Sequence, residues 1–201
     1  MTGFSLLELM VALSLGSLLC IGIFNIFLTI KQLHQRQLLL STTQEKMRFI
    51  SFFLREKIQM AGNWSCLSQS KEPKSIVIRS YNKKQAYKKL KLTIQSKTNL
   101  LQLHECIRMH DQFRYLPIYF FIAHTSRQKN NHHINALFFK IGHHPKEELI
   151  TNMTQFKIQL YHVTGSKKNN RAVKIHYKLQ SQYDDHFSQS GILYVARRSV
   201  V

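Results

Sequence analysis

Acidic residues are scarce in this sequence: Asp and Glu total 10, against 29 Lys and Arg, and the formal net charge is +19 at pH 7. So few carboxylates leave few candidates for an active site that works with a carboxylate pair. The sequence also lacks a glycine-rich phosphate loop, a Gly-x-Ser-x-Gly turn, a His-Glu-x-x-His helix and a Cys-x-x-Cys pair. Each of these marks a common kind of catalytic or binding site. We therefore predict that the protein is not an enzyme and carries no cofactor.

The 11 histidines form no pattern typical of a metal site. His132-His133 and His143-His144 are adjacent pairs, and neighbours on an extended segment point to opposite faces. We expect both pairs to lie in surface loops. Residues 184–186, Asp-Asp-His, are predicted to form a polar turn before the last strand. We therefore predict no metal site, and a metal-dependent enzyme is the most distant alternative.

Proline and glycine are absent from residues 31–61, so nothing in this stretch breaks a helix. Polar residues fill the positions between apolar residues that recur at helical spacing: Leu33, Leu40, Met47, Ile50, Leu54 and Ile58. The pattern predicts a helix that ends at about Ala61, with Gly62 and Asn63 as the stop. Counted from Phe4, such a helix is about 87 Å long, which is too long for an ordinary globular domain.

An uncharged apolar run occupies residues 9–30. At ~1.5 Å per residue it is long enough to cross a hydrocarbon core of about 30 Å. A single acid, Glu8, precedes the run. A carboxylate in lipid costs roughly 2.5–3.5 kcal/mol on insertion scales, so such an acid usually has a functional reason. A secretory signal peptide would have a basic segment before the run and a small-residue cleavage site after it, and neither is present. We predict a single-pass membrane anchor.

The sequence from Gly3 to Leu9, Gly-Phe-Ser-Leu-Leu-Glu-Leu, resembles the class III leader and first helix of type IV pilins and of the pseudopilins of type II secretion. The resemblance implies that residues 1–3 are a leader, that a prepilin peptidase cuts between Gly3 and Phe4, and that Phe4 is then methylated on its amine. It also implies that Glu8 faces the positively charged N-terminus of a neighbouring subunit during filament assembly. A buried amine is a cation able to neutralise a carboxylate in lipid. The alternative is an ordinary anchor with an acid near the membrane interface.

Two later segments are similar to the minor pilins of the PilW type: residues 53–66, where a helical run leads into Met-Ala-Gly and Cys66, and residues 147–158. The resemblance implies a minor pilin that primes assembly of a type IV pilus as part of a tip complex, with roles in pilus biogenesis, motility or adhesion. The implied partners are the prepilin peptidase, other minor pilins, the major pilin and a tip adhesin, in a hetero-oligomer. The alternatives are a type II secretion pseudopilin and a DNA-binding minor pilin for DNA uptake.

This resemblance places the chain in the inner membrane, with its domain in the periplasm, and in the pilus after assembly. It implies four parts: the leader at residues 1–3, the transmembrane helix at 4–30, the exported amphipathic half of the same helix at 31–62, and an antiparallel β-sheet domain at 63–201. The periplasm permits disulfides, and Cys66 and Cys106 are the cysteines of the exported part, so we expect them to form one. Cys20, in the span, is expected to act as a small buried hydrophobe.

Past residue 62 the sequence changes to short segments rich in Ile, Val, Leu, Tyr and Phe, several of which alternate with polar residues, a pattern typical of strands. We predict strands at residues 75–81, 86–94, 99–106, 117–124, 135–141, 155–163, 172–179 and 192–198. Residues 165–170 are typical of a loop between two antiparallel strands. Half-polar strands favour a sheet with one face in water and one under the helix. The predicted fold is α+β and type IV pilin-like: a long N-terminal transmembrane helix packed on an antiparallel β-sheet domain.

Positive charge dominates the part of the chain past the span. All 29 Lys and Arg and every acid except Glu8 lie there, so its net charge exceeds the whole-chain value of +19 by one. Such a field favours anionic partners such as lipid head groups, surface polyanions or DNA. Residues 81–91 hold five lysines and two tyrosines in a hairpin-like stretch, a composition that suits single-stranded nucleic acid. The alternative, which we favour, is a solvated edge strand whose lysines prevent edge-to-edge pairing.

Overall fold

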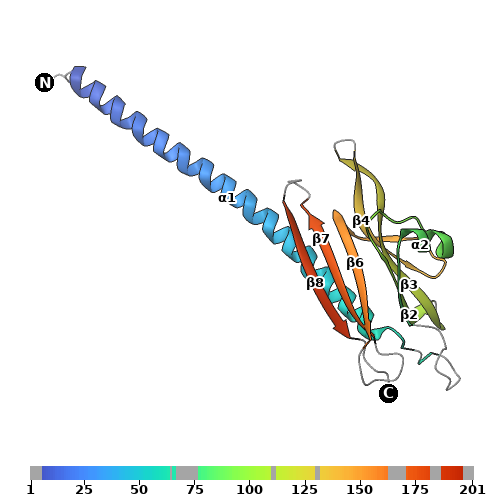
Figure 1. Cartoon of the computed structure of the whole chain (residues 1–201). Helices are drawn as coiled ribbons and strands as arrows, with labels where there is room; N and C mark the ends of the chain where they lie inside the picture. The colour runs from blue at the N-terminus through green and yellow to red at the C-terminus, as the bar shows by residue number, and fades with distance from the viewer. Residues whose placement is uncertain are drawn as a thin grey trace. The chain divides into compact units, whose positions relative to one another are not determined.

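The computed structural model describes residues 6–63, 65–66, 77–109, 112–129, 132–162, 171–181 and 187–196. The chain divides into two compact units, Met1–Thr42 and Thr43–Val201. The described part of the first unit is helical throughout. The second unit contains the rest of that helix, a short second helix and two sheets (Figure 1).

Helix α1, Leu6–Met60, is 55 residues long. It ends just before Gly62, which has a φ of +85°. This left-handed conformation closes many helices, and glycine adopts it without steric cost. The backbone N–H of Asn63 then donates to the carbonyl of Met60 at 3.0 Å. The predicted helix and its end near Ala61 are confirmed by these residues.

The strands of the second unit form two antiparallel sheets in which consecutive strands pair. Sheet A has the order β1-β2-β3-β4-β5, with β1 Ile78–Tyr81, β2 Leu100–Met109, β3 Gln112–Lys129, β4 His132–Ile141 and β5 Glu147–Thr151. Sheet B has the order β6-β7-β8, with β6 Met153–His162, β7 Arg171–Gln180 and β8 Ser188–Ala196. The single sheet that the sequence suggested is therefore two.

The main core lies between α1 and one face of each sheet. Ile50, Leu54 and Ile58 form a stripe on α1 at helical spacing, and each is at most 1% exposed. They cluster with alternate residues of both sheets. The ring of Phe53 on α1 meets that of Phe120 on β3 edge-on, with centroids 6.1 Å apart. This packing confirms the predicted α+β layout, a long N-terminal helix packed on antiparallel sheet structure.

Sheet B packs closely on α1 at Gly191 of β8. A Cβ added to Gly191 would lie 2.6 Å from Cζ of Tyr177 and 2.8 Å from Cε of Met47 on α1, closer than real Cβ contacts. Burial raises the pKa of Tyr177, against a smaller lowering by its hydrogen bond with Ser51 of α1. Glycine thus leaves room for a tyrosine ring between the sheet and the helix.

A second, smaller core covers the opposite face of sheet A. Helix α2, Lys83–Leu90, lies on this face and buries Ala86 there with Ile94 and with residues of β2, β3 and β4. Along β3, Phe120 and Ile122 point into the main core, while Tyr119 and Phe121 point into the second one. The expectation of one face in water is therefore wrong for sheet A, because a strand that is apolar at consecutive positions is buried on both faces. Sheet B has the expected half-polar alternation.

The strand predicted at residues 86–94 is wrong, because the first part of that segment belongs to α2. Asn82 caps this helix: its Oδ1 accepts from the backbone N–H of Gln85 at 2.9 Å, and its own N–H donates to Oε1 of Gln85 at 3.2 Å. This reciprocal pair is a capping box. Strand β5 was also missed, since no strand was predicted between residues 141 and 155.

The chain passes from sheet A to sheet B through Asn152, which separates β5 from β6. Its φ is +62°, a left-handed value that asparagine tolerates better than most residues. The N–H of Asn152 donates to the carbonyl of Asn135 on β4 at 2.7 Å, and its carbonyl accepts from Gln180 on β7 at 2.8 Å. One residue therefore links both sheets.

Candidate functional site

The N-terminal half of α1 exposes its apolar side chains. Every large hydrophobic residue from Leu6 to Ile30 is exposed, and Leu19, for example, is 68% exposed. Soluble monomers rarely leave so continuous an apolar surface uncovered. Among the described residues, α1 is the one helix long and apolar enough to cross a membrane. The apolar run that the sequence predicts as an anchor is thus helical, and its large side chains are exposed.

Polar side chains in this half bond to the helix backbone. Ser14 Oγ donates to the carbonyl of Val11 at 2.8 Å, and Thr29 Oγ1 donates to that of Asn25 at 2.9 Å. Such bonds give a hydroxyl a partner inside its own helix, where lipid offers none. These residues are therefore compatible with a membrane-spanning helix.

Glu8 is the acid in the first turn of α1, and it is exposed. A carboxylate at this end of a helix interacts favourably with the helix dipole. The expected cleavage and methylation residues, Gly3 and Phe4, lie outside the described residues. The structure therefore describes Glu8 but not the predicted processing site.

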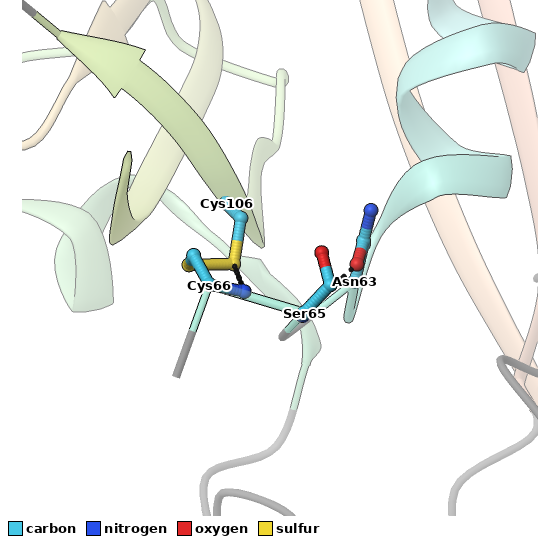
Figure 2. The surroundings of a disulfide bond; sticks show 4 residues. All are labelled: Asn63, Ser65, Cys66 and Cys106. Atoms are coloured by element: carbon cyan, nitrogen blue, oxygen red, sulfur yellow. Dashed lines mark hydrogen bonds between the residues drawn. A yellow bond between two sulfur atoms is a disulfide. The ribbon is translucent and has the colours of Figure 1, made fainter. Parts of the chain in front are cut away.

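A disulfide joins the segment just after α1 to strand β2 of sheet A (Figure 2). Cys66 and Cys106 have Cα atoms 5.9 Å apart, and they are 40 residues apart in sequence. Three hydrogen bonds from backbone N–H groups surround the bridge. The N–H of Cys66 donates to Sγ of Cys106 at 3.2 Å. The N–H of Gly62 donates to the carbonyl of His104 at 2.6 Å, and that of Cys106 to the carbonyl of Asn63 at 3.0 Å. We call these bonds and the disulfide the clasp.

An ion pair lies beside the clasp. Lys57, in the last turn of α1, donates to Oε1 of Glu105 on β2 at 2.7 Å. Glu105 is buried, and a buried carboxylate needs such a partner. Next to it, burial and the charge of Arg79 lower the pKa of His104, although a hydrogen bond with the backbone of Val77 opposes this. The last turn of α1 is thus fixed to β2 by an ion pair, and the residues just after the helix are fixed to β2 by the clasp.

Metal-binding candidates do not converge in the described part of the chain, where no group of three His, Cys, Asp or Glu residues could hold an ion. His143 and His144 lie in the turn after β4, as expected for surface residues. His132 and His133 open β4, so their assignment to a loop is wrong. Residues 184–186 lie outside the described residues.

The basic segment at residues 81–91 is neither a hairpin nor an edge strand, because its lysines lie on and around α2. A second basic surface, which the sequence reasoning missed, is the outer face of sheet B. Lys174 pairs across the strands with Tyr194 on one side and Gln159 on the other. None of the residues in β6, β7 and β8 is acidic. The alternation of Lys157, Lys174 and Lys178 with buried residues was the signal that could have revealed it.

An aromatic side chain lies within this basic face. Tyr194 is 63% exposed, and Nζ of Lys174 lies 5.1 Å from the centroid of its ring. Interaction with the Tyr194 hydroxyl raises the pKa of Lys174. The outer face of sheet B therefore presents cations and an accessible ring together.

Comparisons with protein-family models, with curated protein sequences and with solved structures gave no significant match.

Proposed function

We propose that this protein is a minor pilin of the PilW type that primes assembly of a type IV pilus as part of a tip complex. The observation that carries the proposal is the position of Glu8, a single carboxylate in the first turn of a helix whose next residues are apolar and exposed. The Gly-Phe-Ser-Leu-Leu-Glu-Leu sequence adds the resemblance to pilin leaders. The role is structural rather than catalytic.

In this proposal, a prepilin peptidase cuts between Gly3 and Phe4 and the amine of Phe4 is methylated. Glu8 then pairs with the N-terminal amine of a neighbouring subunit inside the membrane. Each charge neutralises the other, which offsets the cost of keeping either one in lipid. The apolar half of α1 is at first covered by lipid and later by the helices of other subunits.

The clasp suits a subunit whose helix is held in a filament while its domain lies outside. The Lys57–Glu105 ion pair ties the last turn of α1 to sheet A, and the disulfide ties the segment just after the helix to the same sheet, so a force on the helix reaches the domain through several contacts. A disulfide is also compatible with the oxidising periplasm. The proposed partners are the prepilin peptidase, the other minor pilins, the major pilin and a tip adhesin, and the proposed location is the inner membrane and then the pilus.

Replacing Glu8 by glutamine tests the proposal, because it removes the charge and keeps the size. We expect Glu8→Gln protein to be processed and membrane-bound as usual, while its amount in sheared pili falls about tenfold or more, since breaking a buried charge pair costs several kcal/mol. Glu45→Gln is the matched control, because Glu45 is an exposed acid on the same helix beyond the apolar run. Equal incorporation of the Glu8→Gln and Glu45→Gln proteins would contradict the proposal.

A DNA-binding role is a second candidate, and the outer face of sheet B favours it. Its lysines suit phosphates, and Tyr194 offers a ring on which a base can stack. We expect the affinity for a labelled single-stranded oligonucleotide to fall as the salt concentration rises from about 50 to about 200 mM. Lys174→Gln/Lys178→Gln should lower the salt slope by ~0.7 for each lysine that contacts a phosphate. The control variant, Lys88→Gln/Lys89→Gln on α2, should leave the salt slope unchanged. Equal reductions of the slope in both double variants would show that DNA binding depends only on total charge.

A further inference from the structure

A cavity of about 490 Å³ lies on the side of sheet A that carries α2. Its wall is built from segments far apart in the sequence: Lys83 of α2, residues 93–96, Ala123 and His124 of β3, and Lys146 before β5. This volume lies within the range of pockets that hold small ligands. The pocket is separate from the clasp, from Glu8 and from the outer face of sheet B.

The charge of this pocket has one sign. Lys83 and Lys146 both line it, His124 adds an imidazole, and no lining residue is acidic. The nearest acids in sequence, Glu147 and Glu148, follow Lys146 in β5, and Glu148 forms an ion pair with Arg127. Two ammonium groups without a carboxylate in the same cavity favour an anion.

The remaining wall offers hydrogen bonds and a small apolar floor. Ser96 Oγ accepts from Nζ of Lys83 at 3.1 Å. Oε1 of Gln95 is buried and has no hydrogen-bond partner among the described residues, although the backbone N–H of Gln95 is fixed to the carbonyl of Ile122 at 2.8 Å. A buried polar atom without a partner is costly unless a ligand or water satisfies it. Ile94 and Ala123 are buried beside these groups and supply apolar contact.

We propose that this pocket binds a small polyhydroxylated anion, a phosphorylated or carboxylated sugar, with its anionic group between Lys83 and Lys146. A sugar hydroxyl donates a hydrogen bond to the unpartnered Oε1 of Gln95. The C–H face of the sugar ring lies on Ile94 and Ala123. Inorganic phosphate can contact only the two lysines, and a neutral sugar can contact only Gln95 and the apolar floor. Neither of them therefore uses the whole pocket. The inference does not depend on the pilin assignment.

The test is titration of the full-length protein in a polyoxyethylene detergent, which carries no sugar or charge, with glucose 6-phosphate, glucuronate, glucose and inorganic phosphate. We expect the two anionic sugars to bind more tightly than glucose or phosphate. Lys83→Gln/Lys146→Gln should weaken their binding about tenfold or more, since each lysine makes a charge-assisted contact. Lys174→Gln/Lys178→Gln removes the same charge from sheet B and should change nothing.

A second variant tests the hydroxyl contact without changing charge. Gln95→Leu should reduce the preference for glucose 6-phosphate over inorganic phosphate, while the thermal unfolding of the variant stays close to that of the parent protein. The ligand could come from a surface glycan or from a soluble metabolite, and an oligosaccharide that ends in the same phosphorylated sugar distinguishes the two. Tighter binding of the oligosaccharide than of the free sugar indicates a surface glycan, and equal binding indicates a soluble metabolite. Failure of both anionic sugars to bind, or equal weakening by the two lysine pairs, would overturn the inference.

Discussion

The two halves of α1 differ in apolar content and in surroundings. In the first half, Leu18 is 65% exposed, and its large apolar neighbours are exposed on every side of the helix. In the second half, from Thr43, Leu54 is 0% exposed, and the buried apolar residues form one stripe in the main core, whereas Phe52 remains 68% exposed. A helix that is apolar all round needs an environment that surrounds it, whereas an amphipathic helix needs one packed face. The first half is therefore long and apolar enough to cross a membrane, whereas one face of the second half packs in the core of this domain.

Truncating a leucine in each half tests this comparison most strongly. Leu54→Ala should lower the free energy of unfolding of the domain by about 3–5 kcal/mol, because it leaves a cavity in the main core. Leu18→Ala should leave it unchanged, because Leu18 is 65% exposed and belongs to the other compact unit. Chemical denaturation of both variants in detergent, followed by near-ultraviolet circular dichroism, measures the difference. A comparable loss for Leu18→Ala would show that the first half also stabilises the domain.

Removing the disulfide tests how much the clasp contributes to the stability of the domain that contains the second half of α1. Cys66→Ser/Cys106→Ser opens a 40-residue separation and should cost about 3–4 kcal/mol, mainly through the entropy that the unfolded chain regains. Reduction of the parent protein with a thiol should give the same loss, measured by denaturation. Cys20→Ser is the control, since Cys20 is a free cysteine in the apolar half. An unchanged midpoint in the double variant would contradict a stabilising role for the clasp.

Filling the space at Gly191 tests the packing of sheet B on the second half. Gly191→Ala should destabilise the domain by about 1–3 kcal/mol, because the new methyl group collides with Tyr177 and Met47. Met47→Ala in the same chain removes one of the two colliding groups. We therefore expect the double variant to lose less than the sum of the single variants in thermal unfolding. Additive losses would place the strain elsewhere.

The smallest effect expected is a pH dependence near the clasp. The pKa of His104 is lowered from 6.5 in the folded protein, so the unfolded chain binds more protons than the folded one in the window just below this value. Stability is therefore complete above about pH 6.5 and decreases as the pH falls toward the lowered pKa. His104→Gln should reduce the difference in unfolding free energy between pH 7.5 and 5.5. An identical difference in both proteins would exclude His104 as its source.

Long and regular elements were predictable from the sequence, and short ones were not. The absence of proline and glycine from residues 31–61 and the apolar run before them indicated α1, and alternation indicated the strands of sheet B. Helix α2 was missed because eight lysine-rich residues bury little beyond Ala86, although Asn82 and Gln85 carried a capping signal. Strand β5 was missed because Glu147 and Glu148 make it polar, and only Ile150 is buried in it.

The candidate sites also differ in how far the sequence could predict them. Glu8 and the pair Cys66 and Cys106 were found because each is a rare residue type in its part of the sequence. The anion pocket could not be found in this manner, because Lys83, Gln95, His124 and Lys146 belong to separate segments that only the packing of α2 on sheet A brings together. The sequence shows the alternation of lysines with apolar residues in the strands of sheet B. The lack of acids indicates a basic surface only once the three strands are known to be adjacent.

The most direct test of the pilin proposal is the intact mass and N-terminal sequence of the protein extracted from membranes, with and without the prepilin peptidase. The account predicts a chain that begins at methylated Phe4 when the peptidase is present, and an unprocessed chain that begins at Met1 when it is absent. A chain that keeps Met1 in both cases would contradict the account, and α1 would then be a plain membrane anchor in which Glu8 has no part in assembly.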